Sequence, residues 1–359
     1  MKKLYLILLF SASTWSAWAQ TTSCAQSVRL AQSVYDQGRL HELEDLITKA
    51  LNNPAAQCGQ AEQISLLKLL TLTYIYLEEP QKADATMLKL LQTDHYFQIN
   101  EAVDPAEFVA LYRTFRTKEI YRIGATLGVN ASQPNVINTI SAVELDASSK
   151  YKYGIGIQFG VSADVPLQVG KKKHYRLTLH GELLYMQHKF ELEQKVNKGV
   201  NLDGVELFQT LQAAESQNWL TIPISAQYAF TRNEKLNPYI AGGFSVGYLM
   251  GNGTLRAERF RDEAAAIPET SFNLLREKIN MSALVAAGIK SKVGGGYVVL
   301  EARYMHGLSK VSTSETAYQN QQAAWGPYYA DSVFKLSSLS ISGSYIINMF
   351  NPKKLRNRS

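Results

Sequence analysis

The chain has 359 residues, 46% of them hydrophobic, with a formal net charge of +6 and a sequence pI near 9.0. A basic excess is compatible with nucleic-acid binding, but its main clusters, Lys171–Lys173 and Lys353–Arg358, come with no aromatic–basic platform. We therefore expect no nucleic-acid partner and assign these clusters to solvated turns and termini near anionic lipid head groups. Twenty Tyr and 23 Gly favour a sheet-rich protein over a helical one.

The first residues form a targeting signal. Lys2-Lys3 precede the apolar run Leu4–Phe10, and Ala17-Trp18-Ala19 supplies a small-residue cleavage box. This order is typical of a secretory signal peptide, because the apolar run is too short to span a bilayer as a helix. We predict that residues 1–19 are removed and that the mature protein leaves the cytoplasm. An N-terminal membrane anchor is the alternative.

The chain contains two cysteines, Cys24 and Cys58. An oxidising compartment permits a disulfide between them, and closing a loop of roughly 34 residues is worth about 3–4 kcal/mol in the chain-entropy model. Two cysteines without nearby paired histidines argue against a zinc site. We expect no metal and no cofactor.

Residues 20–117 carry apolar side chains at helical spacing, which predicts an all-α domain of helix pairs. The predicted helices carry Val28, Ala31, Val34 and Tyr35; then Leu40, Leu43, Leu46, Ile47 and Leu51; then Ile64, Leu67, Leu70, Tyr74 and Leu77; then Ala83, Met87, Leu90 and Leu91. A last helix, from Asp104-Pro105 to Arg116, opens with a capping residue and with proline in its first turn.

The stretch from Tyr76 to Phe97 resembles a tetratricopeptide repeat, and Ala31, Tyr35 and Gly38 make a looser earlier copy. The resemblance implies stacked helix pairs with a concave surface that docks a partner protein. A plain helical bundle is the alternative.

From Tyr121 onward the period changes to two, which indicates β-strands. The stretch 151–167 has Tyr153, Ile155 and Ile157 in one register and small or polar residues in the other. In a soluble sheet the apolar face packs on a core, whereas in an outer-membrane barrel it meets lipid and the polar face fills the lumen.

The neighbouring strands decide between these alternatives. Seven further alternating stretches occur at 121–130, 174–186, 218–230, 237–250, 280–293, 297–308 and 334–350. The connections alternate between long (131–150, 192–217, 250–279, 309–333) and short (167–173, 231–236, 294–296). This rhythm is typical of a barrel with short periplasmic turns and long surface loops. We therefore predict an eight-stranded antiparallel transmembrane β-barrel over residues 118–350, with its apolar face toward lipid, followed by a basic periplasmic tail over 351–359.

Charged and polar residues on the inward register predict a plug. Eight strands leave a lumen just wide enough for side chains, and buried charges require partners. The predicted lumen charge plug consists of Arg122, Asp164, Arg176, His180, Glu182, Lys290, Glu301 and Arg303.

Residues 119–350 resemble the porT-like outer-membrane β-barrels of Bacteroidetes-type bacteria. The resemblance rests on the first strand IYRIGATLGVN, the proline-bearing fourth strand LTIPISAQYAF and its successor LNPYIAGGFSVGYLM. The last strand, ISGSYIINMF, resembles an outer-membrane assembly signal, although the tail NPKKLRNRS follows it where many such proteins end. The resemblance implies an association with the type nine secretion and gliding apparatus, and no catalytic motif.

Two patterns resemble catalytic chemistry. Gly243–Gly247 matches G-x-S-x-G around Ser245, but that motif requires a sharp strand-to-helix turn, and here it lies inside an alternating strand. His180, Glu182 and His188 follow one another on the third strand. We expect His180 to belong to the plug and His188 to lie at the surface rim, so we predict no catalytic residues.

The sequence therefore predicts a non-enzymatic outer-membrane protein, embedded in outer-membrane lipid, with its helical domain and tail in the periplasm. Residues 20–117 would dock a periplasmic or envelope protein, in keeping with the secretion or gliding apparatus that the resemblance implies. One alternative is an outer-membrane enzyme that hydrolyses lipids or peptides, or a small-solute pore. Another is an adhesin that uses its long loops, among them the aromatic stretch Trp325–Tyr329.

Overall fold

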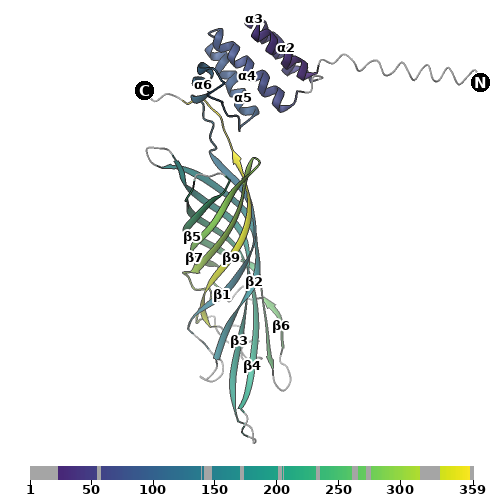
Figure 1. Cartoon of the computed structure of the whole chain (residues 1–359). Coiled ribbons are helices and arrows are strands. Elements are labelled where there is room, and N and C mark those ends of the chain that lie inside the picture. Colours follow the sequence, from purple (N-terminus) through teal and green to yellow (C-terminus); the bar gives the residue numbers. More distant parts are fainter. Residues whose placement is uncertain are drawn as a thin grey trace, which may run out of the picture. The chain divides into compact units, whose positions relative to one another are not determined.

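The structure is a computed structural model that divides into two compact units, one of residues 1–119 together with 350–359 and one of residues 120–349 (Figure 1). It describes residues 23–54, 58–138, 140, 148–169, 174–200, 204, 206–231, 235–260, 266–271, 276–315 and 332–355. The predicted signal peptide and the aromatic stretch 325–329 lie outside these residues. The C-terminal tail, predicted as a separate segment, groups with the helical unit.

The first unit contains five described helices. They are α2 (Cys24–Asp36), α3 (Leu40–Asn52), α4 (Gln60–Tyr76), α5 (Pro80–Thr93) and α6 (Ala106–Arg113). Gly38 adopts a φ of +72°, which a glycine tolerates without strain, at the turn between α2 and α3. None of the described helices is long and apolar enough to cross a membrane. The tetratricopeptide-like nature of the helix pairs stays a prediction.

The helical unit has an apolar core of its own. Leu43, Ile47 and Leu66 are fully buried where α2, α3 and α4 meet, and Leu90 and Phe108 are fully buried among α4, α5 and α6. Leu43 and Ile47 lie on the apolar face that the helical spacing predicts for α3. In contrast, α4 is apolar on nearly all of its faces and contributes buried side chains to both clusters, as a central helix does.

One detail of this unit differs from the prediction. Pro105 occupies the N-cap position of α6, where no side chain caps the helix. The Asp104 carboxylate instead accepts hydrogen bonds from the Asn100 backbone N–H and from Lys68. The prediction of Asp104 as a helix cap was wrong because Lys68 on α4 and the backbone N–H of Asn100, four residues earlier, take both of its oxygens.

In the second unit, eight described strands close into an antiparallel ring. They are β1 (Tyr121–Asn138), β2 (Ser148–Val169), β3 (His174–Val200), β4 (Glu206–Ala229), β5 (Asn237–Phe260), β7 (Ile279–Val293), β8 (Gly296–Gly307) and β9 (Val333–Met349). Their order is β4-β3-β2-β1-β9-β8-β7-β5, and β4 pairs with β5 to complete the circle. The predicted eight-stranded antiparallel barrel is confirmed.

Several strands run farther than the sequence indicated. The predicted long connection 192–217 is mostly a hairpin in which β3 and β4 stay paired as far as Val200 and Glu206. The connections 131–150 and 250–279 are likewise partly strand, and the latter adds a short strand, β6 (Ala266–Ser271), that pairs with β5. The prediction placed strand ends where the apolar alternation stops, but backbone pairing continues beyond the apolar band.

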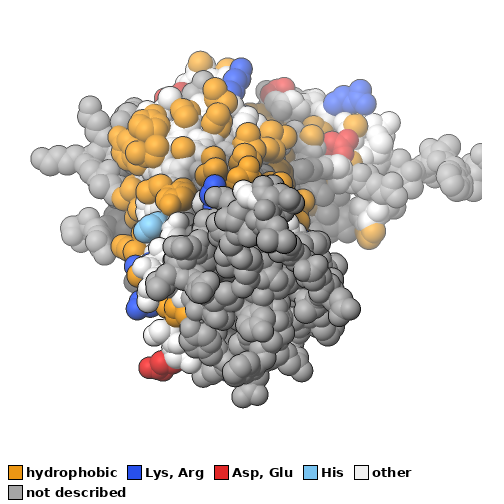
Figure 2. Space-filling model, turned by 90° about the horizontal axis from the view of Figure 1, so that it is seen from below, with side chains coloured by type: hydrophobic (Ala, Val, Ile, Leu, Met, Phe, Trp, Pro, Cys, Tyr) orange, Lys and Arg blue, Asp and Glu red, His pale blue; other side chains and the backbone are white. Residues whose placement is uncertain are grey.

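The register of the strands turns the apolar side chains outward. On β2, Ile155 and Phe159 are 67% and 48% exposed, whereas Gln158, Ser162 and Asp164 are buried inside the ring. Figure 2 shows many hydrophobic side chains gathered on the visible face of the molecule. The apolar face of the stretch 151–167 is therefore the outside.

The glycines of the inward register let strands approach closely. A Cβ atom added at Gly156 would lie 1.7 Å from the carbonyl oxygen of Gln187 on β3. Gly156 lies between Tyr153 and Gln158, where the register of β2 against β3 shifts. A side chain at this position would force the two backbones apart.

Candidate functional site

The interior of the barrel is built around His180 of β3, which lies between two carboxylates. Its Nδ1 atom is 2.5 Å from an Asp164 oxygen, and its Nε2 atom is 3.4 Å from a Glu182 oxygen. All three side chains are buried. The cross-strand register pairs Asp164 on β2 directly with His180 on β3, so the sheet itself sets this contact.

Lys290 joins this group from β7, on the other side of the ring. Its Nζ atom lies 2.9 Å from the second oxygen of Asp164 and donates a hydrogen bond to Gln227 at 2.6 Å. The ammonium group also lies 5.0 Å from the centre of the Tyr239 ring. Asp164 is therefore contacted by basic side chains from two separate strands.

Arg303 of β8 neutralises the remaining acidic side chains. It forms an ion pair with Glu182 and another with Glu301, the latter at 2.6 Å. The Tyr239 hydroxyl donates a hydrogen bond of 2.6 Å to Glu301. Four strands, β2, β3, β7 and β8, thus contribute ion-paired side chains to one network, and β4 and β5 add hydrogen-bonding partners, as a narrow lumen that must bury charge requires.

The two other predicted members of the plug have different outcomes. Arg122 of β1 places its guanidinium 4.9 Å from the centre of the Tyr297 ring, at one edge of the network. The side chain of Arg176 lies outside the part of the structure that is described. The structure therefore brings together seven of the eight predicted residues, with Arg122 as the most peripheral.

Sequence analysis missed Gln227 and Tyr239, the partners of Lys290 and Glu301. Both lie on inward registers, Gln227 on β4 and Tyr239 on β5, and both are buried. Following the alternation along 218–230 and 237–250 with the same rule would have found them. As uncharged side chains, they were not among the charged residues from which the plug was predicted.

A second layer inside the barrel is apolar. The cluster consists of Phe190, Trp219, Leu249, Val311, Phe334 and Leu336. The buried pair Arg276–Glu215, with nitrogen–oxygen distances of 2.8 and 2.7 Å, lies beside it, and the Arg276 guanidinium is 5.3 Å from the centre of the Phe334 ring. No pattern in the sequence pointed to this pair, because Glu215 and Arg276 both lie in predicted long connections, 192–217 and 250–279.

The residues that resembled catalytic groups lie inside the strands. Ser245 is buried on β5 and donates a long hydrogen bond to the Met305 sulfur at 3.7 Å. His188 is buried, with its Nδ1 atom 2.6 Å from the Ser132 hydroxyl. The expectation that His188 lies at the surface rim was wrong, because β3 runs on to Val200 and keeps His188 on the inward register.

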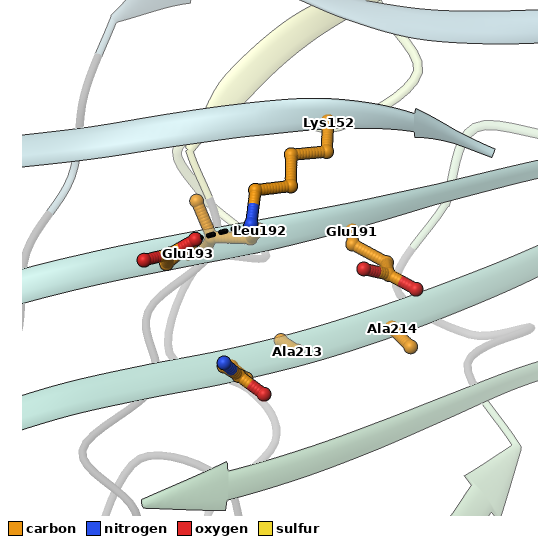
Figure 3. A pocket seen from close by; sticks show the side chains of 7 residues that line it. Lys152, Glu191, Leu192, Glu193, Ala213 and Ala214 are labelled. Carbon is orange, nitrogen blue, oxygen red and sulfur yellow. Dashed lines mark ion pairs between the residues drawn. The ribbon is translucent and has the colours of Figure 1, made fainter.

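A pocket of about 270 Å³ is lined by residues of β2, β3 and β4 (Figure 3). Its lining consists of Lys152, Glu191, Leu192, Glu193, Gln212, Ala213 and Ala214. Figure 3 shows Lys152 extending from β2 toward Glu193 on β3, with which it forms an ion pair of 2.5 Å. The lining offers polar and charged contacts, and its seven residues include no serine, threonine, cysteine or histidine.

The helical unit carries the predicted disulfide pair and one notable carboxylate. Cys24 and Cys58 are joined by a disulfide, with Cα atoms 5.0 Å apart.

Burial acts to raise the pKa of Asp104, but hydrogen bonds from Lys68 and from the Asn100 backbone, together with the Lys68 charge, outweigh the effect of burial. They hold the pKa of Asp104 below its usual range. Among the described residues, no group of three or more His, Cys, Asp or Glu side chains could hold a metal ion.

Comparison with known proteins gives one family. Residues 116–313 match the family model described as "Outer membrane protein beta-barrel domain". No curated protein matches the sequence.

Solved structures of bacterial surface proteins are similar to this chain at low identity. The neisserial surface protein A is 13% identical, with 64% of this chain and 97% of that chain covered and a TM-score of 0.31. The outer membrane protein OprG from Pseudomonas aeruginosa is 10% identical, with 65% and 98% covered and a TM-score of 0.31. The attachment invasion locus protein Ail of Yersinia pestis, in complex with a heparin analogue, is 11% identical, with 64% and 99% covered and a TM-score of 0.26.

Proposed function

This chain belongs to the outer membrane protein beta-barrel domain family, and from that premise we propose that it is a non-enzymatic outer-membrane protein whose helical unit binds a protein of the envelope. The observation that carries the proposal is that the helical unit is a separate folded body, with its own apolar core and its own disulfide. A closed barrel already satisfies the backbone hydrogen bonds of its strands. The helices therefore serve a task other than completing the barrel, and protein binding suits such a unit.

We place the helical unit and the tail in the periplasm. The chain enters β1 and leaves β9 at the same end of the barrel, because Tyr121 pairs with Met349. The short connections β2–β3, β4–β5 and β7–β8 lie at that end too. Outer-membrane barrels keep their short turns on the periplasmic side, which supports this orientation.

Transport through the barrel is not part of the proposal. The ion-paired network and the apolar cluster fill successive layers of the interior. The cavities that border the network have volumes of about 10 and 50 Å³, enough for one to a few water molecules. A lumen packed in this way supports an anchoring role for the barrel.

The resemblance of residues 119–350 to the porT-like barrels extends the proposal to a class of partner. Members of that family are associated with the type nine secretion and gliding apparatus. We therefore propose a component of such an envelope assembly as the protein that residues 20–117 bind, with the tetratricopeptide-like helix pairs as the binding surface.

A single deletion tests the proposal. A chain that keeps residues 1–20 but lacks 21–115 should still insert, since the barrel's strands and interior network remain, and it should migrate on gels as a heat-modifiable barrel. In intact cells it should lose the cross-linked envelope partner that the full chain captures. The matched control removes 196–208, the tip of the β3–β4 hairpin, and should keep the partner. Failure of the deleted chain to assemble would make the helices a structural part of the barrel and reject the proposal.

The pocket in Figure 3 favours a second candidate function, ligand binding by the barrel's surface hairpins. Lys152 and Glu193 offer both charges within one shallow site, which suits a zwitterionic or sugar-like ligand. Replacing Lys152 and Glu193 together by glutamine should abolish adhesion to a glycan array if this function operates. It should leave partner capture by the helical unit unchanged.

A further inference from the structure

The last described residues of the chain form an extended segment on the helical unit. The Arg116 backbone N–H donates to the Lys353 carbonyl at 2.9 Å, and the Leu355 N–H donates to the Thr114 carbonyl at 2.8 Å. Phe115 and Lys354 form the antiparallel bridge between these bonds. The segment after α6 therefore accepts the tail as a second strand, the backbone geometry by which proteins bind extended peptides.

Side chains fix the start of this segment. The Phe350 ring packs edge-on against His95 and Tyr96, with ring centres 5.5 and 5.0 Å apart. The Arg116 guanidinium donates two hydrogen bonds, of 3.1 and 2.7 Å, to the Asn351 carbonyl. The helical unit thus has a place for one aromatic side chain and a clamp for the backbone carbonyl of the next residue.

A carboxylate receives the fifth residue of the segment. Asp84 on α5 forms an ion pair with Lys354 through its Oδ2 atom. Its Oδ1 atom is covered, yet it accepts no hydrogen bond from any residue that the structure describes. A lysine is a point charge and reaches one oxygen, whereas the fork of an arginine fits both oxygens of a carboxylate. The site is therefore chemically better matched to arginine than to the residue that occupies it.

The tail itself is weakly covered. Asn351, Lys353, Lys354 and Leu355 are all exposed, and the Lys354 side chain retains half of its accessible surface. A segment held on one side, with solvent on the other, can be exchanged for another segment without unfolding the helices beneath it.

We propose that Asp84, His95, Tyr96 and the backbone of Thr114–Arg116 form a peptide-binding groove for an extended segment that carries an aromatic residue and, four residues later, an arginine. The tail is the resident intramolecular ligand of this groove, with lysine at the arginine position. The inference rests on the proposed function, since it names the chemistry of the protein segment that the helical unit accepts. A partner segment with arginine gains the second oxygen of Asp84 and displaces the tail.

The test uses the full chain in detergent micelles and a form lacking 350–359, which vacates the groove. The probes are three fluorescent peptides of residues 348–355, one with the natural sequence, one with Lys354→Arg and one with Lys354→Glu, measured by fluorescence anisotropy. We expect the vacated form to bind the Lys354→Arg peptide at least five-fold more tightly than the natural one, and the Lys354→Glu peptide not at all. The full chain should bind the Lys354→Arg peptide at least ten-fold more weakly than the vacated form does.

The matched control is Asp84→Asn, which keeps the shape of the side chain and removes its charge, and it should abolish the preference for arginine. If the shortened chain fails to assemble, the assay uses a full-length variant with Phe350→Ala and Lys354→Glu in its place. These two substitutions weaken the contacts of the tail with the helical unit. Equal affinity for the arginine and lysine peptides, or equal affinity of the full and vacated forms, overturns the inference. The assay contains no envelope partner, so such a result leaves partner capture by the helical unit to its own deletion test.

Discussion

The two units of this protein differ in the side chains that they bury, because the helical unit buries mainly apolar ones and the barrel buries an ion-paired network beside an apolar cluster. The helical unit buries Leu43, Ile47 and Phe108, whereas the barrel buries Asp164 and Lys290 and exposes side chains such as Leu127 at 68% of its surface. Both arrangements follow from one rule, that apolar surface leaves water. In the helical unit, apolar side chains leave water by packing into the interior. In a barrel that spans a bilayer, apolar side chains can face outward and contact lipid.

The difference shows where the specificity of each fold resides. An apolar core tolerates exchange among residues of similar volume. A lumen of paired charges does not, because each removed partner leaves a buried charge behind. The barrel interior should therefore be the more sensitive of the two units to single substitutions, and the following predictions test this contrast.

The largest effect is expected for Arg303→Leu in the barrel. The change leaves Glu182 and Glu301 without the cation that pairs with both, and breaking a buried pair in this way costs about 3–5 kcal/mol. Urea titration in lipid vesicles, followed by heat-modifiable gel migration, measures the loss of unfolding free energy.

The matched control is Lys152→Met, which breaks the pair between the exposed Lys152 and the partly exposed Glu193 on the same barrel. Exposed pairs contribute less than about 1 kcal/mol, so this variant should resemble the unchanged protein. Equal losses for the two variants would mean that the interior network does not stabilise the barrel and would remove the contrast between the units.

The next effect concerns the helical unit alone. Replacing Cys24 and Cys58 by serine removes a cross-link that spans 34 residues, and the chain-entropy model assigns it about 3–4 kcal/mol. Thermal unfolding followed by far-UV circular dichroism should show an earlier helical transition, while the heat-modifiability of the barrel stays unchanged. Adding a reductant should produce the same earlier helical transition in the natural protein and should not change the variant. A shift in the barrel transition instead would contradict the independence of the two units.

Sequence reasoning reached the barrel because a period of two and an alternation of loop lengths are properties of the chain itself. It placed His180, Glu182 and Arg303 in one lumen for the same reason, since an inward register fixes which side of a strand a residue occupies. The sequence could not predict which of these side chains form ion pairs with one another. Whether Arg303 meets Glu182 or Asp164 depends on the stagger of strands around the ring, which no local pattern encodes.

The misses also have a physical reason. Arg276 lies in the connection before β7, where no strand pattern is expected, and His188 lies beyond the point where apolar side chains mark the outside of β3. There the outward residues are free to be polar, so the alternation disappears from the sequence although the backbone pairing persists. The contacts of the tail with Asp84 were equally invisible, because they join residues 270 positions apart in the chain.

A smaller effect is expected for Leu127→Lys, which tests the outward face directly. Leu127 lies in the middle of the paired part of β1, and a lysine on the lipid face near the bilayer centre costs about 2–4 kcal/mol. The control is Tyr121→Lys at the first residue of β1, for which the cost near the interface falls to about 0–1 kcal/mol. Unfolding titrations in lipid vesicles measure both; a position-independent cost would place this face against water or protein instead of lipid.

The smallest effect is a pH dependence confined to the helical unit. Asp104 has a pKa held below its usual range by Lys68 and by the Asn100 backbone, against the opposing effect of burial. Because the folded pKa lies below the unfolded one, the carboxylate stabilises the unit fully above about pH 4 and progressively less as the pH falls through the folded pKa. Asp104→Asn should therefore lower the helical unfolding temperature at pH 7 and leave a smaller difference at pH 3.

Lys68→Met should show the same trend, since it removes the cation that lowers the pKa of Asp104. The barrel transition, monitored in the same samples by gel migration, provides the internal reference. If the unfolding temperatures of variant and natural protein differ by the same amount at pH 3 and pH 7, the Asp104 charge does not stabilise the helices.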